Sequence, residues 1–211
     1  MRFAPDCRPA ILLSALLALG SLYLSGLLAA VFVVLLGFVL WFSRDPERVP
    51  PEDADVWVVP ADGKVVEVHE ADVPGLGTMR KVGIFMSPLD VHVNRFTCRG
   101  TVTALEYVPG KKWMAFAPKA SEENERMLVT LETGAGPVRL VQIAGFLARR
   151  IVCRLAKGDV LDRGARYGMI KLGSKVDVYV PLSVKLSVRI GDRVSAGQSA
   201  LGVMGHENHE A

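Results

Sequence analysis

A glycine followed by a serine, Gly173 and Ser174, is the pair of residues with the most distinctive potential chemistry in this chain. The pair directly precedes an alternating segment, Lys175–Val180, whose pattern is typical of a β-strand. The Ser174 hydroxyl can attack the Gly173 carbonyl and move the acyl group from nitrogen to oxygen, and glycine tolerates the close approach that this requires. Elimination from the resulting ester would cut the chain and, after hydrolysis, leave a pyruvoyl group at position 174. Otherwise Ser174 is an ordinary turn hydroxyl.

The chain has four histidines, and His92 is the candidate group for proton transfer. It follows an apolar stretch that reaches Phe85 and Met86, and an unperturbed imidazole gains and loses protons near neutral pH. The alternative is a hydrogen-bonded, half-buried histidine on a strand. His69 stands in an acidic stretch, so we expect it to be solvated. The other two lie in a polar C-terminal tail that we expect to be disordered, namely His206 and His209.

Two aspartates are candidates for orienting the imidazole of His92. Asp62 belongs to an Asp-Gly pair, which is a common signal for a hairpin turn. Its functional interpretation is a carboxylate that holds the histidine and raises its basicity. Asp90 stands two residues before His92 and would share its face in an extended segment. Spacing alone does not decide between these interpretations.

Two further segments have both a structural and a functional interpretation. The charged run from Lys119 to Arg126 is typical of a solvated loop, and the alternative is a polar contact to a substrate or to the segment around Ser174. The segment from Pro109 to Pro118 mixes basic and apolar residues. Such a mixture suits contact with lipid headgroups and acyl chains, and an ordinary hairpin loop explains it equally well.

The composition excludes several classes of protein. The 211 residues carry a net charge of +3 with scattered basic residues, which is not the footprint of a nucleic-acid-binding protein. Three cysteines, without a Cys-x-x-Cys pair, argue against a disulfide framework and favour a reducing compartment. Because His and Cys residues do not stand at zinc-binding spacings, we expect no metal site. Glycine-rich motifs for nucleotide phosphates are also absent from the sequence.

The N-terminal part predicts a membrane anchor over residues 1–43. From Ala10 to Phe42 the sequence is almost entirely apolar and carries no charge. One helix over this range would be about 50 Å long, which exceeds the roughly 30 Å hydrocarbon core of a bilayer. The alternatives are a tilted single span and a helical hairpin broken near Gly20–Ser21 or Ser25–Gly26. Basic residues flank both ends and favour the hairpin, with both ends cytoplasmic: Arg2, Arg8, Arg44 and Arg48.

The remainder, residues 44–211, predicts a mainly β domain of the barrel or sandwich type. Short β-rich stretches alternate with Gly and Pro, and helical periodicity is weak apart from one turn near Ser121–Arg126. The predicted strands are Val56–Val59, Gly63–His69, Arg80–Met86, Gly100–Tyr107, Met127–Thr133, Val138–Ala144, Lys175–Val180 and the surroundings of Ser187–Val188.

Two distant stretches resemble the two halves of a biotinyl or lipoyl domain. Pro60–Val68 is similar to the first hairpin of such a domain, and Ile190–Val203 is similar to its closing half, with tight turns at Gly191 and Gly197. This resemblance predicts a barrel-sandwich hybrid in which the start and the end of the domain pack against each other. A non-enzymatic, membrane-anchored adaptor of this type is one functional alternative, although the carrier lysine of a Met-Lys-Met hairpin is absent.

Taken together, the motifs resemble the phosphatidylserine decarboxylase proenzyme family, in its short, archaeal-type branch. The matching stretches, besides the apolar N-terminus, are Arg44–Pro46, Pro60–Gly63, Ser87–His92, Asn124–Arg126 and Leu172–Ser174. The resemblance implies self-cleavage between Gly173 and Ser174. The products would be a β chain, residues 1–173, and an α chain, residues 174–211, which form a heterodimer; a higher oligomer is left open.

The resemblance also implies roles for single residues. Ser174 would supply the pyruvoyl cofactor, and Asp62 and His92 would complete the self-cleavage triad. Asp90 and Asn94 are the candidates for supporting this site. The longer bacterial members carry a second histidine where this chain has Arg95, so either His92 serves both cleavage and turnover or another group takes one role.

The implied reaction is the decarboxylation of phosphatidylserine to phosphatidylethanolamine in phospholipid biosynthesis. The pyruvoyl carbonyl would form a Schiff base with the substrate amine and draw electrons from the bond to the carboxylate, so that CO₂ leaves. The implied location is the cell membrane, with the catalytic domain on its cytoplasmic face. A decarboxylase for a related seryl-phospholipid is the enzymatic alternative.

Overall fold

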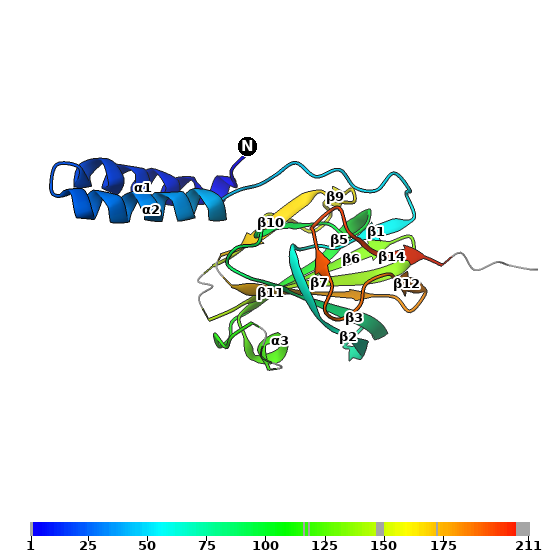
Figure 1. Ribbon diagram of the computed structural model, residues 1–211. Helices are drawn as coiled ribbons and strands as arrows, with labels where there is room; N and C mark the ends of the chain where they lie inside the picture. Colours follow the sequence, from blue (N-terminus) through cyan, green and yellow to red (C-terminus); the bar gives the residue numbers. More distant parts are fainter. Residues whose placement is uncertain (1, 116, 118, 147–149, 172, 206–211) are drawn as a thin grey trace, which may run out of the picture. The chain divides into compact units, whose positions relative to one another are not determined.

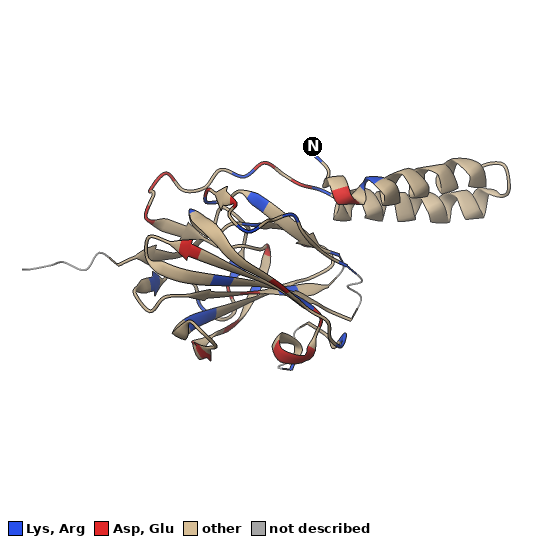
Figure 2. Cartoon of the chain, turned by 180° about the vertical axis from the view of Figure 1, so that it is seen from behind, with Lys and Arg blue, Asp and Glu red and all other residues tan. Residues whose placement is uncertain are grey.

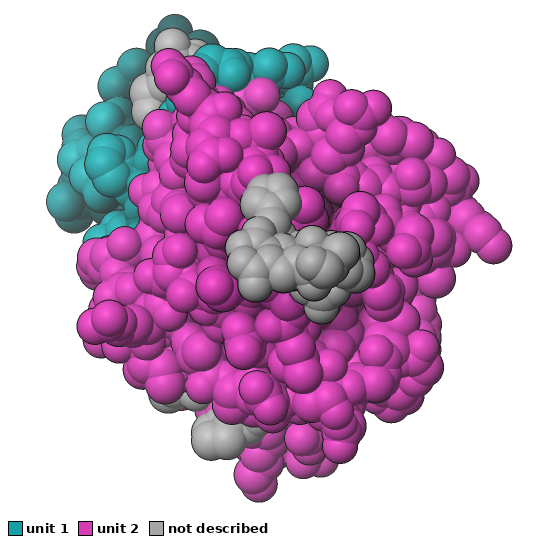
Figure 3. Space-filling view, turned by 90° about the vertical axis from the view of Figure 1, so that its right-hand side faces the viewer, with its two compact units in different colours: residues 1–47, 88–91 teal, residues 48–87, 92–211 magenta. Residues whose placement is uncertain are grey.

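A computed structural model describes residues 2–115, 117, 119–146, 150–171 and 173–205. The chain divides into two compact units (Figure 3). The first comprises residues 1–47 and 88–91, and the second comprises residues 48–87 and 92–211.

The apolar N-terminal run forms two helices that lie side by side (Figure 1, blue). They are α1 (Arg8–Ser21) and α2 (Gly26–Phe42), preceded by the 3-10 turn η1 (Pro5–Cys7). The chain reverses between Ser21 and Gly26, as expected for the hairpin rather than for one continuous helix. Ser25 caps α2, because its side chain accepts a hydrogen bond of 3.1 Å from the backbone N–H of Leu28. No described helix combines the length and the apolar character needed to cross a membrane.

The two ends of the hairpin are tied together at its base. The backbone N–H of Asp45 donates to the carbonyl of Arg2 over 2.8 Å. The Arg44 guanidinium lies 4.2 Å from the ring centroid of Trp41, a cation–π contact. Figure 2 shows the helices themselves almost entirely in tan, with the charged residues gathered at the base. The two helices therefore form one continuous surface without charged side chains between Ala10 and Phe42.

The second unit is mainly β. Its strands are β1 (Val56–Val58), β2 (Gly63–Val73), β3 (Gly77–Met86), β4 (Val93–Arg95), β5 (Gly100–Val108), β6 (Arg126–Thr133), β7 (Gly136–Ala144), β8 (Ile151–Cys153), β9 (Val160–Leu161), β10 (Arg166–Ile170), β11 (Ser174–Val180), β12 (Val184–Leu186), β13 (Arg193–Val194) and β14 (Ala200–Met204), with a short helix α3 (Ala120–Glu123). The described strands form an eight-stranded sheet in the order β13-β2-β3-β11-β7-β6-β5-β9, and two three-stranded sheets, β1-β14-β12 and β4-β10-β8.

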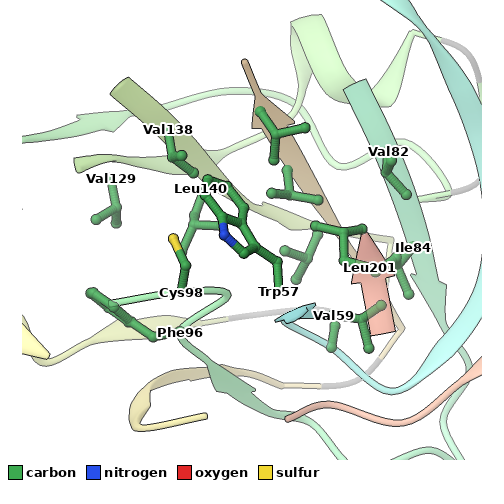
Figure 4. Close-up of a cluster of buried hydrophobic side chains, with 14 of the residues drawn as sticks. Trp57, Val59, Val82, Ile84, Phe96, Cys98, Val129, Val138, Leu140 and Leu201 are labelled. Atoms are coloured by element: carbon green, nitrogen blue, oxygen red, sulfur yellow. The ribbon is translucent and has the colours of Figure 1, made fainter. Parts of the chain in front are cut away.

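Strand β11 is a central strand, and its alternate residues face opposite sides of the large sheet. Val176 and Val178 are fully buried in the hydrophobic core. Ser174 has the same parity as these valines, whereas Lys175 and Asp177 have the opposite parity. Figure 4 shows side chains that line the core, among them Trp57, Val82, Ile84, Leu140 and Leu201. The alternation thus places Ser174 and the charged residues of β11 on different faces.

The predicted strands agree with the observed ones over the long elements. Those predicted between Val56 and Val180 coincide with observed strands to within a few residues at their ends. Of the strand predicted at Ser187–Val188 with its flanks, only the preceding flank is observed, as β12. The single helical turn expected near Ser121–Arg126 is observed one residue earlier, as α3.

The two segments that were expected to pack against each other do so. Strand β13 pairs with β2, with Arg193 opposite Lys64 and Val194 opposite Gly63. Strand β14 pairs with β1. The backbone N–H of Gly197 donates to the Val59 carbonyl over 2.9 Å. The start and the end of the domain are therefore joined by main-chain hydrogen bonds.

Candidate active site at the start of strand β11

Ser174 is the first residue of β11, and it is fixed on both sides by neighbouring strands. It pairs with Met86 of β3 and with Ala144 of β7. Its side chain is fully buried, and its Oγ lies 3.4 Å from the Met86 Sδ. Pairing on both sides fixes the backbone of Ser174, and its buried hydroxyl contacts the Met86 sulfur.

The peptide before Ser174 has a special conformation and a special neighbour. Gly173 has φ of +62°, a left-handed conformation that favours glycine. A Cβ on Gly145 would overlap the Gly173 carbonyl oxygen and lie 3.1 Å from the Cβ of Ala115. The missing side chain of Gly145 thus makes the space in which the Gly173 carbonyl lies. The Gly173 carbonyl is therefore closely surrounded, which would hold it in place for the attack that the sequence predicts from Ser174. Leu172, the third residue of the motif, lies outside the described residues.

Met86 connects Ser174 to two buried amides. The Asn94 Nδ2 lies 3.7 Å from the Met86 Sδ, the same sulfur that Ser174 contacts. The Asn94 Oδ1 accepts a hydrogen bond of 2.8 Å from the Gln142 Nε2. Asn94 and Gln142 are both fully buried. The structure therefore brings the expected supporting residue Asn94 next to Ser174, and it adds Gln142, which the sequence did not indicate.

Asp62 lies in the turn that leads into β2, two residues before Lys64, the first residue of β2 that pairs with β3. Its Oδ1 accepts a hydrogen bond of 2.7 Å from the Ala196 N–H, and its Oδ2 pairs with the Arg48 guanidinium at 2.9 Å. A Cβ on the following Gly63 would lie 3.3 Å from the Cα of Met86. The carboxylate thus has a structural role in this turn, and the residue that follows Asp62, Gly63, packs closely against the Phe85–Met86 backbone that borders Ser174.

His92 is fully buried directly before β4. Its backbone carbonyl accepts a hydrogen bond of 3.4 Å from the Ile170 N–H of β10. His69 is exposed on β2, as expected. The remaining histidines, His206 and His209, lie outside the described residues. Asp90 is half-buried in the segment 88–91, which groups with the N-terminal unit, and its orienting role stays a prediction.

A family model for phosphatidylserine decarboxylase matches residues 35–202. The chain belongs to the phosphatidylserine decarboxylase family. It is 48% identical over 171 residues to the phosphatidylserine decarboxylase proenzyme of Chlorobium chlorochromatii, which covers 81% of each chain. It is 50% identical over 172 residues to the proenzyme of Salinibacter ruber, covering 79% of this chain and 76% of the relative. The resemblance inferred from the motifs is therefore confirmed.

Arg95, the residue at which this phosphatidylserine decarboxylase was expected to depart from longer members, is built into the structure. Its Nη1 donates to the Gly164 carbonyl over 3.0 Å, and a Cβ on Gly197 would lie 2.8 Å from its Cδ. Its backbone N–H donates to the Pro60 carbonyl over 2.9 Å, which joins β4 to the turn that carries Asp62. The buried Arg95 side chain thus joins two turns of this domain.

Asn124, which belongs to the charged run and to the matching stretch Asn124–Arg126, is fully buried. Its Nδ2 donates to the Ala144 carbonyl at 2.7 Å and to the Trp113 carbonyl at 2.8 Å, and its Oδ1 accepts from the Trp113 N–H at 2.8 Å. Ala144 is the strand partner of Ser174. Asn124 therefore fastens the loop that contains Trp113 beside the candidate site. The sequence left open whether this run is a solvated loop or a polar contact near Ser174, and the hydrogen bond to Ala144 favours the second interpretation for Asn124.

We expect Asn124→Ala to destabilise the protein by about 2 to 4 kcal/mol, because the buried Ala144 carbonyl and the part-buried main-chain groups of Trp113 would lose the Asn124 side chain as a partner. Denaturant unfolding of the purified protein measures this loss. Glu122→Ala is the matched control, since this neighbouring side chain is exposed and should change stability by less than about 0.5 kcal/mol. Equal effects of the two substitutions would contradict the assigned role of Asn124.

Proposed function

We propose that this phosphatidylserine decarboxylase matures by cutting itself between Gly173 and Ser174, and that Ser174 is the source of its pyruvoyl group. The family is one of carboxy-lyases that convert phosphatidylserine to phosphatidylethanolamine, and its proenzymes carry a pyruvoyl group derived from serine. The observation that carries the assignment is the arrangement of three residues. Ser174 is buried in a central strand, Gly173 has a positive φ, and Gly145 leaves the space around the Gly173 carbonyl.

The proposed self-cleavage needs one proton acceptor, one elimination and one water. The Ser174 Oγ attacks the Gly173 carbonyl carbon and passes its proton to a base, which we assign as His92 oriented by Asp62. The C–N bond breaks as the ester C–O bond forms, and the freed amine takes up a proton. Removal of the Cα proton of residue 174 then breaks its Cβ–Oγ bond and releases the Gly173 carboxylate. Water hydrolyses the remaining dehydroalanine amine to the pyruvoyl group and ammonia.

The residues around position 174 suit the second reaction as well. The pyruvoyl group supplies an electrophilic carbonyl that accepts electrons as CO₂ leaves the substrate. Asn94 contacts the same Met86 sulfur as Ser174, and it and its partner Gln142 provide fixed amide dipoles near position 174. We assign to His92 the delivery of a proton to the Cα of the substrate after CO₂ has left, because it is buried and histidine is the side chain best suited to give and take protons in catalysis.

We further propose that the helical hairpin attaches the enzyme to the cell membrane, with the catalytic domain on the cytoplasmic face. Large apolar side chains at the tip of the hairpin are exposed, as far as 90% for Tyr23 and 81% for Leu27. Exposed apolar surface of this extent is typical of lipid contact. The pairing of β13 with β2 and of β14 with β1 supports a lipoyl-like, barrel-sandwich-hybrid arrangement for the catalytic domain.

The deciding experiment is intact mass spectrometry of the purified protein beside Ser174→Ala. We expect the wild type to give two chains, the smaller one starting at residue 174 with a blocked, carbonyl-reactive N-terminus, and the variant to stay whole. Only the cut protein should decarboxylate phosphatidylserine in mixed micelles, and the uncut Ser174→Ala variant should be inactive. A correctly folded wild type that stays whole in lipid would contradict the mechanism and favour a non-enzymatic adaptor. Cleavage without activity on phosphatidylserine would point to a related seryl-phospholipid.

A further inference from the structure

The face of β11 opposite to Ser174 carries a ring of four charged side chains. Lys175 and Asp177 come from β11, Glu67 from β2 and Lys81 from β3. The Lys175 and Asp177 side chains are 0% and 1% exposed, and that of Lys81 is 8% exposed. Glu67 is the most accessible member, at 24%. The ring thus lies almost entirely within the protein.

Each carboxylate of the ring contacts both lysines. The Lys175 Nζ lies 2.5 Å from the Glu67 Oε1 and 3.1 Å from the Asp177 Oδ1. The Lys81 Nζ lies 2.6 Å from the Glu67 Oε2 and 3.1 Å from the Asp177 Oδ2. The Ser121 hydroxyl, on α3, accepts hydrogen bonds from both lysines, at 2.9 Å and 3.2 Å. The charges balance, and the ring connects three strands and one helix.

Gly83 makes room for the ring, and the two lysines favour the charged form of Glu67. A Cβ on Gly83 would lie 2.7 Å from the Lys175 Cε and 3.0 Å from the Asp177 Oδ1, so the glycine leaves the space that the ring occupies. Burial alone would raise the pKa of Glu67, but hydrogen bonds from Lys175 and Lys81 outweigh it and lower this pKa. Buried charged groups of this kind often contribute less to stability than apolar residues of similar size, so their presence here calls for a specific role.

The position of the proposed cut suggests that role. Cleavage before Ser174 would turn the start of β11 into a chain end, and chain ends fray unless they are held. Lys175 and Asp177 would then belong to the α chain, whereas Glu67, Lys81 and Ser121 would belong to the β chain. The ring would become a set of ion pairs between the two chains, placed one residue from the reactive group.

We propose that this ring is a clamp that holds the new N-terminus of the α chain in register, with Lys175 as the positioning residue for residue 174. The proposal rests on the proposed cleavage between Gly173 and Ser174. Before cleavage the peptide bond to Gly173 also holds residue 174, so the clamp matters most in the mature enzyme. Its loss should therefore affect the cut protein more than the uncut protein.

The test compares Lys175→Met in two backgrounds, the self-cleaving chain and the uncut Ser174→Ala chain. We expect the Lys175→Met chain to cut itself. The fall in Tm caused by Lys175→Met should be larger in the cut protein than in the uncut Ser174→Ala protein, by about 4 °C or more. Turnover per pyruvoyl group should fall about tenfold or more in kcat, since misplaced reacting groups are penalised steeply. KM should change less than kcat. Lys175→Arg should restore much of the loss, because it keeps the charge.

Two further variants keep the test decisive. Lys185→Met is the matched control, an exposed lysine of β12 in the same α chain, and it should change neither Tm nor kcat appreciably. Glu67→Gln removes the β-chain partner with little change of shape, and it decides the matter if Lys175→Met does not fold. Equal falls in Tm in the two backgrounds, with kcat unchanged, would overturn the clamp alone. A wild type that stays whole would overturn the cleavage, and the clamp with it.

Discussion

Replacing His92 by glutamine should slow self-cleavage by about 100- to 10,000-fold, the range over which a positioned general base acts. Glutamine keeps a similar size and polarity but cannot take the proton of the Ser174 hydroxyl. His92 is fully buried, so bulk water cannot readily replace it as the base. The measurement is the fraction of cut chain against time after synthesis in a cell-free system with lipid.

A matched histidine is available as the control for this prediction. His69 is exposed on β2, and His69→Gln should leave the rate of cleavage unchanged. A folded His92→Gln chain that cuts itself at the wild-type rate would show that another group is the base. In that case the buried imidazole would have only a structural role, and the assignment of the proton acceptor would have to move elsewhere.

The role of Asp62 needs a separate comparison, because its carboxylate also holds a turn. Asp62→Asn alters the pairing with Arg48 as well as the charge beside the site. Arg48→Met removes the same ion pair and leaves the carboxylate in place. If Asp62 acts through His92, only the aspartate substitution should slow cleavage strongly, and the two should resemble each other in their effect on Tm.

The sequence allowed the long elements to be predicted, because their patterns are local. The alternating residues after Ser174 predicted β11, and the apolar run interrupted by small polar residues predicted the helical hairpin. Short strands such as β8 (Ile151–Cys153) and β9 (Val160–Leu161) were missed. A segment of two or three residues has too few positions for alternation to show, and such strands are defined by their partners rather than by their own sequence.

The parts of the site that were missed share a different cause. Glu67, Lys81 and Lys175 come together from distant parts of the sequence, and in each local segment the charge is typical of a solvated face. Asn124 stands in a charged run for which a solvated loop was one of two interpretations, and the structure shows its side chain buried. Their burial becomes visible only when the strand order is known. Gly173 and Ser174 could be recognised from the sequence because the two groups that would react with each other belong to adjacent residues.

Gly145 is the residue for which the structure predicts the second large effect. It follows β7 and gave no signal in the sequence, yet a Cβ at this position would overlap the Gly173 carbonyl oxygen. Gly145 is not among the glycines with positive φ, so alanine would fit its backbone conformation. The expected effect of Gly145→Ala therefore comes from the new methyl group alone.

We expect Gly145→Ala to slow self-cleavage by about 100-fold or more, because the methyl group must displace the carbonyl that Ser174 attacks, and a displacement of about 1 Å can have this effect. The time course of chain cleavage measures it, with circular dichroism to establish that the variant is folded. Gly134→Ala is the matched control, since a Cβ there meets nothing within 4 Å. Normal cleavage of the folded Gly145→Ala chain would mean that the carbonyl can move freely before the attack. Slow cleavage with the fold intact would identify the space beside Gly145 as the place where the scissile peptide is held.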